Sequence, residues 1–319
     1  MRIVIYLAKR LIYLIPVIFI LTVFVFAMVH LLPGNPADII LAGEGGAEDP
    51  VVRAALMKEF GLDKPLPIQY GIWLWRALHG HFGKSVYSQE EVFNLILYRV
   101  PATLFLAFAA MFVSILVALP AGIISAVKRQ KPADYGAMIF ALLGISLPEF
   151  WFGIMLILVF SLWLRWLPSM GYVSPWENFF GSFKYLILPA VALGLRMAGV
   201  VTRMTRSSML DELGQDYVRT ARAKGLPERT VILLHTLKNA LIPTVTIVGL
   251  QFGAILGGTV VIEMVFSWPG LGQLLVEAIL TRDYLVVQGS VLFISCLFVL
   301  VNFVVDFVYT LLNPRVGLE

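Results

Sequence analysis

The chain has 319 residues, of which 59% are hydrophobic and only 14% are charged. A soluble domain carries about 25% charged residues, so this composition excludes an ordinary water-soluble domain and makes lipid the solvent for much of the surface. The formal net charge of +4 does not indicate a nucleic-acid partner, because the Lys and Arg residues gather at the ends of apolar runs, where they orient membrane proteins. The single cysteine, Cys296, cannot form a disulfide within the chain.

Six apolar segments are each long enough to cross a bilayer, which takes about 20 residues in a helix. Backbone amides find no water in hydrocarbon, so segments this apolar must be helical. The predicted spans are residues 11–32, 100–127, 136–163, 185–205, 241–262 and 286–312. The first is too long for the core of a signal peptide, and no small-residue cleavage site follows it, so we expect it to be retained. The sequence therefore predicts an all-α membrane protein with six transmembrane helices.

The distribution of positive charge predicts the orientation. Lys128, Arg129 and Lys131 lie in the short second loop, and the fourth loop is also rich in Arg and Lys, whereas the third and fifth loops have few cations. Cytoplasmic loops carry the excess of Lys and Arg, so both termini are predicted to be cytoplasmic. Three tryptophans then mark the outer interface: Trp163, Trp166 and Trp176.

Three regions are expected along the chain. Residues 1–32 form the N-terminus and the first span, and residues 33–99 form an external subdomain. Within this subdomain, glycine and proline breaks separate two short predicted helices, Val51–Phe60 and Ile68–Leu78. Residues 100–319 form a core with five spans and a cytoplasmic loop at 206–240.

The most polar long run of the second half lies in that loop, at residues 216–243. In a helix, Tyr217, Ala221 and Gly225 fall on one face, with Val218 beside them. Gly225 can take the positive φ that ends a helix, and Leu226-Pro227 separates it from a second helix that begins near Glu228. The residues alone allow either a solvated basic loop or a docking hairpin, and the ordered small-residue face favours docking.

At this point the sequence resembles a known family. The run DYVRTARAKG…NALIP is similar to the cytoplasmic EAA loop of binding-protein-dependent ABC importer permeases, although Arg219, Thr220 and Ala221 stand in place of Glu-Ala-Ala. The resemblance extends over nearly the whole chain through PATLFLA at 101–107, TRSSMLDEL at 205–213, GLQFG at 249–253, EMVFSWPGLGQLL at 263–275, RDYLVVQG at 282–289 and VNFVVDFVYTLLNPR at 301–315. Their order and spacing are similar to those of the dipeptide/oligopeptide/nickel subfamily.

The resemblance implies a type I ABC importer permease fold in the cytoplasmic (inner) membrane of a prokaryote. It implies a second homologous permease, one or two cytoplasmic ATPase subunits that hold ATP and Mg²⁺, and an external substrate-binding protein that delivers dipeptides, longer peptides, glutathione, nickel or oligosaccharides. The residues expected to couple to the ATPase are Tyr217, Ala221, Arg222, Ala223, Gly225 and Leu226. Those expected in an external gate are Glu263, Phe266, Trp268, Pro269 and Gly270.

The chain itself offers no nucleotide, metal or catalytic site by its sequence. Gly83-Lys84-Ser85 ends like a phosphate-binding loop, but Leu78 stands where the motif needs glycine. His79 and His81 lack a third ligand nearby. Two other classes predict different patterns: a secondary transporter should show inverted repeats with broken helices, and an intramembrane enzyme should show a paired nucleophile and base. Neither pattern appears, and co-purification with an ATPase would separate these classes from an importer.

Charged residues within the spans are costly and mark functional sites. Three are singled out: Glu149, Arg196 and Asp306. Glu149 and Arg196 lie near the middle of antiparallel spans three and four, so they either pair or are solvated separately in a water-filled cavity. Gly249, Gly253 and Gly257 recur every four residues on the fifth span, which favours internal helix packing over a seam with a partner or along a pathway.

Overall fold

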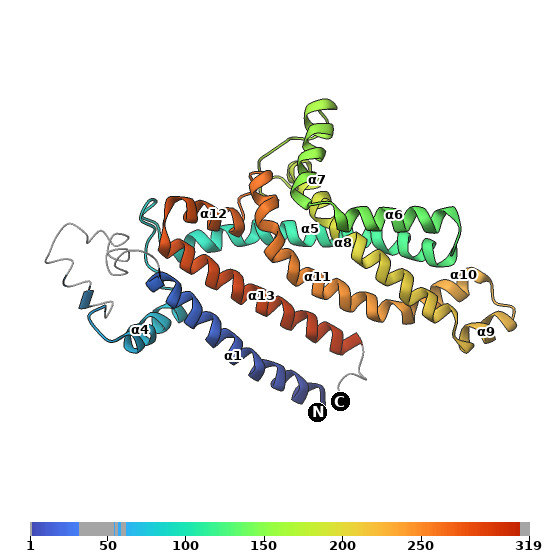
Figure 1. Ribbon diagram of the computed structural model, residues 1–319, viewed down its shortest axis with the longest axis horizontal. Coiled ribbons are helices and arrows are strands. Elements are labelled where there is room, and N and C mark those ends of the chain that lie inside the picture. Colours follow the sequence, from blue (N-terminus) through green and yellow to red (C-terminus); the bar gives the residue numbers. More distant parts are fainter. Residues whose placement is uncertain (1, 32–53, 55–56, 59–61, 313–319) are drawn as a thin grey trace. The chain divides into compact units, whose positions relative to one another are not determined.

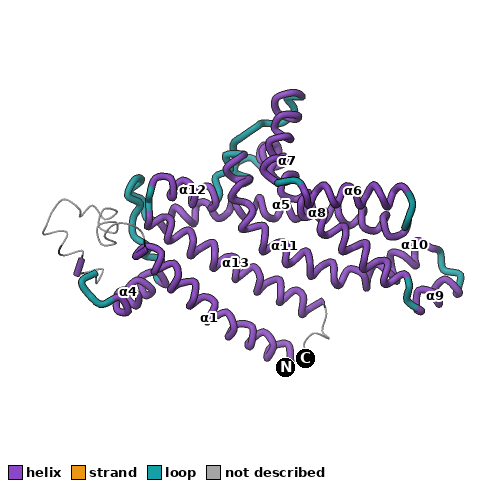
Figure 2. The backbone as a smooth tube through the Cα atoms, viewed as in Figure 1, coloured by secondary structure: helices purple, strands orange, loops and turns teal. Residues whose placement is uncertain are grey.

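The computed structural model describes residues 2–31, 54, 57–58 and 62–312. Every regular element of this part of the chain is a helix, with one isolated bridge between Lys84 and Glu91 (Figures 1 and 2). The chain divides into two compact units. One comprises Val4–Thr103 and Pro269–Leu300; it contains the loop that the sequence predicts to be external and is called the external-loop unit. The other comprises Met1–Ile3, Leu104–Trp268 and Val301–Glu319 and is called the core unit.

The external-loop unit is built from five helical pieces. They are most of α1 (Arg2–Leu31), α4 (Leu66–Leu78), the start of α5 (Val92–Val127), α12 (Leu271–Thr281) and the first part of α13 (Tyr284–Leu312). Its buried centre includes Val92, Ile96, Leu271 and Leu285. Gly289 lets α13 approach α5 closely, because a Cβ at that position would lie 2.7 Å from Val92 Cγ1.

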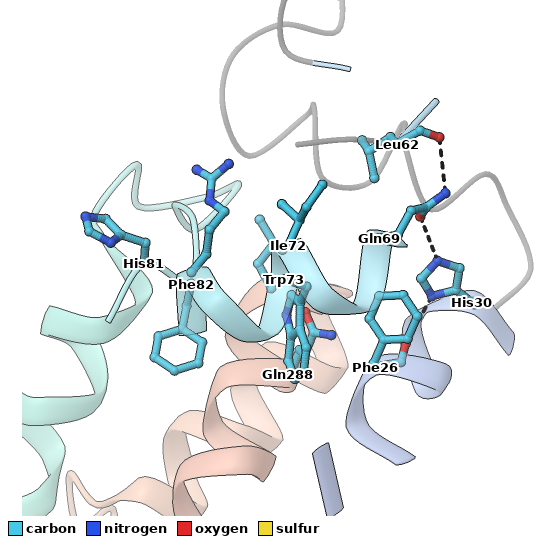
Figure 3. Close-up of a pocket in the computed structure, with 11 residues that line it drawn as sticks. Phe26, His30, Leu62, Gln69, Ile72, Trp73, His81, Phe82 and Gln288 are labelled. Carbon is cyan, nitrogen blue, oxygen red and sulfur yellow. Dashed lines mark hydrogen bonds between the residues drawn. The ribbon is translucent and has the colours of Figure 1, made fainter. Parts of the chain in front are cut away.

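A polar contact joins α1 to α4 within the same unit. Thr22 Oγ1 and the Tyr70 hydroxyl are 2.8 Å apart. Gln69 lies between His30 and the Leu62 carbonyl, 3.4 Å from His30 Nε2 and donating to the carbonyl at 3.2 Å (Figure 3). His30, Leu62 and Gln69 line a small cavity of about 50 Å³. The sequence prediction of a helix over Ile68–Leu78 is confirmed by α4, whereas the predicted helix Val51–Phe60 lies largely outside the described residues.

In the core unit, α8 (Phe179–Leu213) contacts α6, α7 and α11 (Leu237–Val265). Two glycines of α8 permit close backbone approach. A Cβ at Gly194 would lie 2.6 Å from the Ala110 carbonyl oxygen of α5, and one at Gly199 would lie 2.5 Å from the Ala141 carbonyl oxygen of α6. Gly249 and Gly253 of α11 pack in the same way against Val305 and Asn302 of α13, which confirms the packing interpretation for these two positions; nothing lies within 4 Å of a Cβ at Gly257.

The third predicted span, 136–163, is not one continuous helix. It is divided into α6 (Pro132–Ser146), α7 (Glu149–Leu156) and a π-helical segment η1 (Ile157–Trp163), with a bend of 106° between the two parts (Figure 1). The break follows from Pro148. Leu147, the residue before it, is extended at φ −82° and ψ 132°, because the proline ring clashes with a helical residue at that position.

The other predicted spans are present as helices longer than expected. Among the described residues, four helical stretches are long and apolar enough to cross a membrane: those of α5, α8, Glu228–Ile255 and α13. The bent α6–α7 pair would make a fifth. In α1 the described apolar stretch is the shorter Ile12–Met28. The tryptophans predicted at the outer interface are exposed in the described chain: Trp163 by 84%, Trp166 by 69% and Trp176 by 87%.

Candidate functional site

A polar hairpin connects α8 to α11. α9 covers Asp216–Ala223, and after a turn the chain continues through α10 (Glu228–Thr230) and a π-helical segment η2 (Val231–Thr236) into α11 (Figure 1). Gly225 has φ +73° and donates its backbone N–H to the Arg222 carbonyl at 2.9 Å. The predicted helix, left-handed glycine and second helix from Glu228 are therefore confirmed.

The predicted small-residue face is turned differently from what was expected. Val218 and Ala221 are buried, with exposed fractions of 0% and 7%, and pack against Val231. Tyr217, which was placed on the same face, is 38% exposed. The small side chain of Ala221 thus allows the two arms of the hairpin to approach each other. The outward surface belongs to Arg222, Ala223, Gly225 and Leu226, which are all exposed.

An ion pair spans the turn of the hairpin. Arg222 donates from Nη2 to Glu228 Oε1 at 2.7 Å and from Nε to Oε2 at 3.1 Å. This two-pronged contact lowers the pKa of the Glu228 carboxyl below its ordinary value and raises the pKa of the Arg222 guanidinium. Both side chains are substantially exposed, so the pair shapes the turn more than it stabilises the fold.

Tyr217 connects the hairpin to the helices on either side of it. Its hydroxyl donates to the Glu212 carboxylate near the end of α8 and accepts from Asn239 Nδ2 of α11 at 3.0 Å. Burial, followed by the Glu212 contact, raises the pKa of this phenol, so it remains a neutral donor at physiological pH. Tyr217 is therefore a brace that holds α9 against its two flanking helices.

The residues assigned to an external gate lie in two different surroundings. Glu263, Phe266 and Trp268 are buried in the core unit, with exposed fractions of 0%, 2% and 0%. α11 ends at Val265, and the Trp268 N–H donates to the Glu263 carbonyl at 2.8 Å.

Several contacts hold this end of α11 in place. The Trp268 ring packs against Phe105 and Tyr172, and the Gly171 N–H donates to the Phe266 carbonyl at 3.0 Å. This part of the segment is thus a packed corner and not an exposed loop. Pro269 and Gly270 begin the next stretch of the external-loop unit, where Gly270 precedes α12 and Thr103 Oγ1 accepts from the Leu271 N–H at 2.8 Å.

The two charges predicted near the middle of spans three and four form a pair. Arg196 Nη1 lies 3.2 Å from Glu149 Oε2. The arginine side chain is 58% exposed and the glutamate side chain 13% exposed. The pair lines a cavity of about 180 Å³, whose walls also include Gln251 and Gly258 of α11. The paired alternative is therefore confirmed, whereas the side chain of Asp306 lies outside the described part of the chain.

Two buried carboxylates were missed by the sequence reasoning. Asp134, at the start of α6, accepts from Arg206 of α8 at 2.7 and 2.9 Å and from Ser125 Oγ. Asp283 accepts from Ser85 Oγ at 2.6 Å. The available signals were an aspartate in the first turn after Pro132, where the helix dipole favours it, and the position of Arg206 and Asp283 within the quoted motifs.

Ser85 and the two histidines make local structural contacts. Ser85, the end of Gly83-Lys84-Ser85, is only 4% exposed and anchors its loop on Asp283. His79 Nδ1 lies 2.8 Å from the Trp75 carbonyl, and His81 lines the small cavity beside α4 (Figure 3). Within the described residues, no group of three or more His, Cys, Asp or Glu side chains is placed to hold a metal ion.

The sequence matches known protein families over most of its length. Residues 118–318 match the family described as binding-protein-dependent transport system inner membrane component. Residues 3–107 match the N-terminal part of the membrane component of such systems. The two matches include the hairpin, the Glu149–Arg196 pair and the packed corner at the end of α11.

Individual relatives cover nearly the full chain. A protein of Brucella suis biovar 1, provisionally named a peptide transport system permease protein, is 44% identical over 97% of both chains. The glutathione transport system permease protein GsiC of Escherichia coli K12 is 45% identical over 98% of both chains.

Two solved structures share the fold at low sequence identity. The inward-facing MetNI methionine ABC transporter has a TM-score of 0.58 at 19% identity, covering 69% of this chain and 96% of that one. An amino acid ABC transporter crystallised with histidines has a TM-score of 0.51 at 14% identity, covering 70% and 94%.

Proposed function

We propose that this chain, a member of the binding-protein-dependent transport system inner membrane component family, forms half of a pathway for short peptides or a similar small solute. Members of this family are the multi-pass permeases of ATP-driven importers, so the chain is the permease and not the ATPase. A second homologous permease completes the pathway. An external binding protein delivers the solute, and one or two cytoplasmic ATPases supply the energy. The peptide class is supported by the names of the relatives in Brucella suis and Escherichia coli.

The proposal includes six spans with both termini in the cytoplasm. Four helical stretches and the bent pair account for five spans. α1, with 30 residues, is about 45 Å long at 1.5 Å per residue and supplies the sixth. The excess of Lys and Arg in the loops at 128–131 and 203–238 supports this orientation.

The observation that carries the coupling role is the hairpin of α9 and η2. Its arms are held together by Val218, Ala221 and Val231, and its turn is held by the Arg222–Glu228 pair. Because its arms pack against each other, the hairpin can transmit movement of the ATPase to the membrane helices without changing its own shape. The exposed tip around Gly225 and Leu226 then enters the ATPase groove, while Ala221 acts by supporting the tip from within.

ATP binding closes the ATPases and moves the two coupling hairpins of the assembled permeases together, which favours the outward-open arrangement. This is a shift between two packed states, driven by the difference in ATPase affinity for them. The cargo is accepted from the binding protein in that state and released inside after hydrolysis.

The test is uptake by the complete complex in proteoliposomes. The chain is expressed with its partner permease, ATPases and binding protein, and uptake of the probe dipeptide alanyl-alanine, glutathione or a longer peptide is measured with and without ATP. We expect the ATPases to co-purify and uptake to need both ATP and the binding protein. Uptake driven by an ion gradient without ATP would contradict the proposal.

A further inference from the structure

The cavity between α7, α8 and α11 carries one negative and one positive side chain on an otherwise mostly apolar wall. Glu149 is in the first turn of α7, just after the break at Pro148, and Arg196 is in α8. Most of the other lining is apolar, with Gln251 as a further polar side chain. A single charge inside an apolar membrane helix is costly, so charges kept within such helices mark pathways and binding sites.

The ion pair is incompletely satisfied by the described chain. Arg196 contacts Glu149 through one nitrogen at 3.2 Å, and no second hydrogen bond joins its side chain to another described residue. A guanidinium has five N–H donors, so most of them are left for another acceptor. The arginine side chain is also 58% exposed, which would be unfavourable against lipid.

The carboxylate has room on its other side. Glu149 Oε1 lies 3.4 Å from where a Cβ of Gly258 would stand, so it faces a part of α11 that has no side chain. The cavity of about 180 Å³ is well above the roughly 10–15 Å³ that holds one water, so it has room for the charged end of a small solute. Glu149 and Arg196 can therefore both reach a molecule that enters between them.

From this geometry we infer that the Glu149–Arg196 cavity is a transient binding site for a zwitterionic solute, in which Arg196 binds the solute's carboxylate and Glu149 binds its ammonium group. This inference rests on the proposed function and assigns the site to the pathway. In the empty site the two opposite charges neutralise each other through a single hydrogen bond. A zwitterion exchanges this one ion pair for two, so no unpaired charge is created at any stage.

The neutrality of the site determines its selectivity. A solute with equal positive and negative charge leaves the total charge of the cavity unchanged, whereas a solute with one charge leaves one protein side chain without a partner. Such an unpaired group is expensive in a low-dielectric setting. The weak single contact between Arg196 and Glu149 also means that little interaction is lost when the solute separates them.

The test compares charge removal with charge exchange in the complete complex in nanodiscs and proteoliposomes. The variants are Glu149→Gln, Arg196→Gln and the exchange pair Glu149→Arg with Arg196→Glu. Assembly is followed by co-purification with the ATPases, and uptake is measured with alanyl-alanine at saturating binding protein. We expect each single variant to lower uptake by at least about tenfold, which is the typical cost of losing one charged hydrogen bond. The exchange pair keeps the site neutral, so it should assemble like the unmodified complex. It reverses the positions of the two charges, so a solute that enters in the original orientation meets like charges and uptake should not recover.

The exchange pair separates a binding site from a structural ion pair. If it restores both assembly and uptake, the pair only holds the helices together and the inference is overturned. Normal uptake in both single variants would overturn it as well. Failure of the unmodified complex to take up any probe with ATP would instead contradict the proposed function, so the two failures can be told apart.

A size substitution keeps the inference testable even if the charge variants fail to assemble. Gly258→Leu leaves both charges in place but fills the space beside Glu149, whereas Gly257→Leu, one residue earlier, adds a side chain where nothing lies within 4 Å. We expect Gly258→Leu to abolish uptake while the complex still co-purifies with its ATPases, and Gly257→Leu to retain both uptake and assembly. Equal uptake by the two leucine variants would overturn the inference.

Discussion

Arg206 of α8 donates two hydrogen bonds to Asp134 of α6, from Nε to Oδ1 at 2.7 Å and from Nη2 to Oδ2 at 2.9 Å. Ser125, near the end of α5, donates to the same carboxylate, so three helices meet at one buried charge. The Asp134 side chain is 4% exposed and that of Arg206 is 26% exposed. This contact is a structural clamp, because each carboxylate oxygen already has a partner within the chain.

Removing one member of the clamp should destabilise the permease. We expect Asp134→Asn to cost about 3 kcal/mol, since it leaves a mostly buried guanidinium without its counter-charge. The measurement is the thermal midpoint of the purified complex, with the exposed Asp211→Asn as the control. The double variant Asp134→Leu with Arg206→Met should be less damaging than Asp134→Asn, and a larger loss in the double variant would count against the clamp.

The main contribution of the Trp268 side chain should be to the stability of the folded permease. It is 0% exposed and packs against Phe105 and Tyr172, so Trp268→Ala should cost about 3–5 kcal/mol by opening a cavity. Trp268→Phe should lose less. The control is Trp176→Ala, which removes a side chain that is 87% exposed. Equal thermal midpoints for Trp268→Ala and Trp176→Ala would contradict the packed corner.

The Ser85–Asp283 contact should order residues 84–90 of the external-loop unit. Asp283 accepts from Ser85 Oγ at 2.6 Å and from the Val86 N–H at 3.1 Å. Asp283→Ala should therefore increase hydrogen exchange and protease cleavage around residues 84–90, with the exposed Glu90→Ala as the control. Unchanged protection in Asp283→Ala would show that the anchor is dispensable.

Acid should loosen the turn of the hairpin. Because Arg222 lowers the pKa of Glu228 in the folded state, the pair contributes stability above the ordinary pKa of glutamate, about 4.3. That contribution is lost as pH falls through the lower pKa of the folded state. A spin label at Ala223 should become more mobile only in strongly acidic solution, and Arg222→Gln should already be mobile at neutral pH. A pH response that persists in Arg222→Gln would assign it to another group.

At the tip of the hairpin, a residue that can adopt positive φ should replace Gly225 with little loss of transport, but a bulky side chain should not. Gly225 has φ +73°, and nothing lies within 4 Å of a Cβ there. Asn adopts positive φ more readily than most residues, so Gly225→Asn should keep most of the ATP-dependent uptake. Gly225→Trp should retain membrane insertion but lose coupling, because the bulky ring blocks entry into the ATPase groove. Normal uptake and stimulated ATPase activity in Gly225→Trp would refute contact at the tip.

Much of the local structure was predictable because it depends on neighbouring residues. Apolar length placed the helices, and glycine at 225 followed by Leu226-Pro227 placed the turn of the hairpin. The pairing of Glu149 with Arg196 was open to inference because antiparallel spans bring their midpoints to similar depth. The burial of Ala221 inside the hairpin could not be inferred, because helical periodicity identifies residues that share a face but not the residues against which that face packs.

The sequence by itself determined an all-helical membrane protein, because hydrocarbon leaves apolar segments of this length no other way to satisfy their backbone amides. It also carried the family resemblance, since the motifs lie along the whole chain in a recognisable order. Only the tertiary structure decided the 106° bend after α6, the burial of Trp268 and the partners of Asp134 and Ser85. A proline signals a break but not its angle, and the last three depend on contacts between residues far apart in the chain, whose packing no local pattern records.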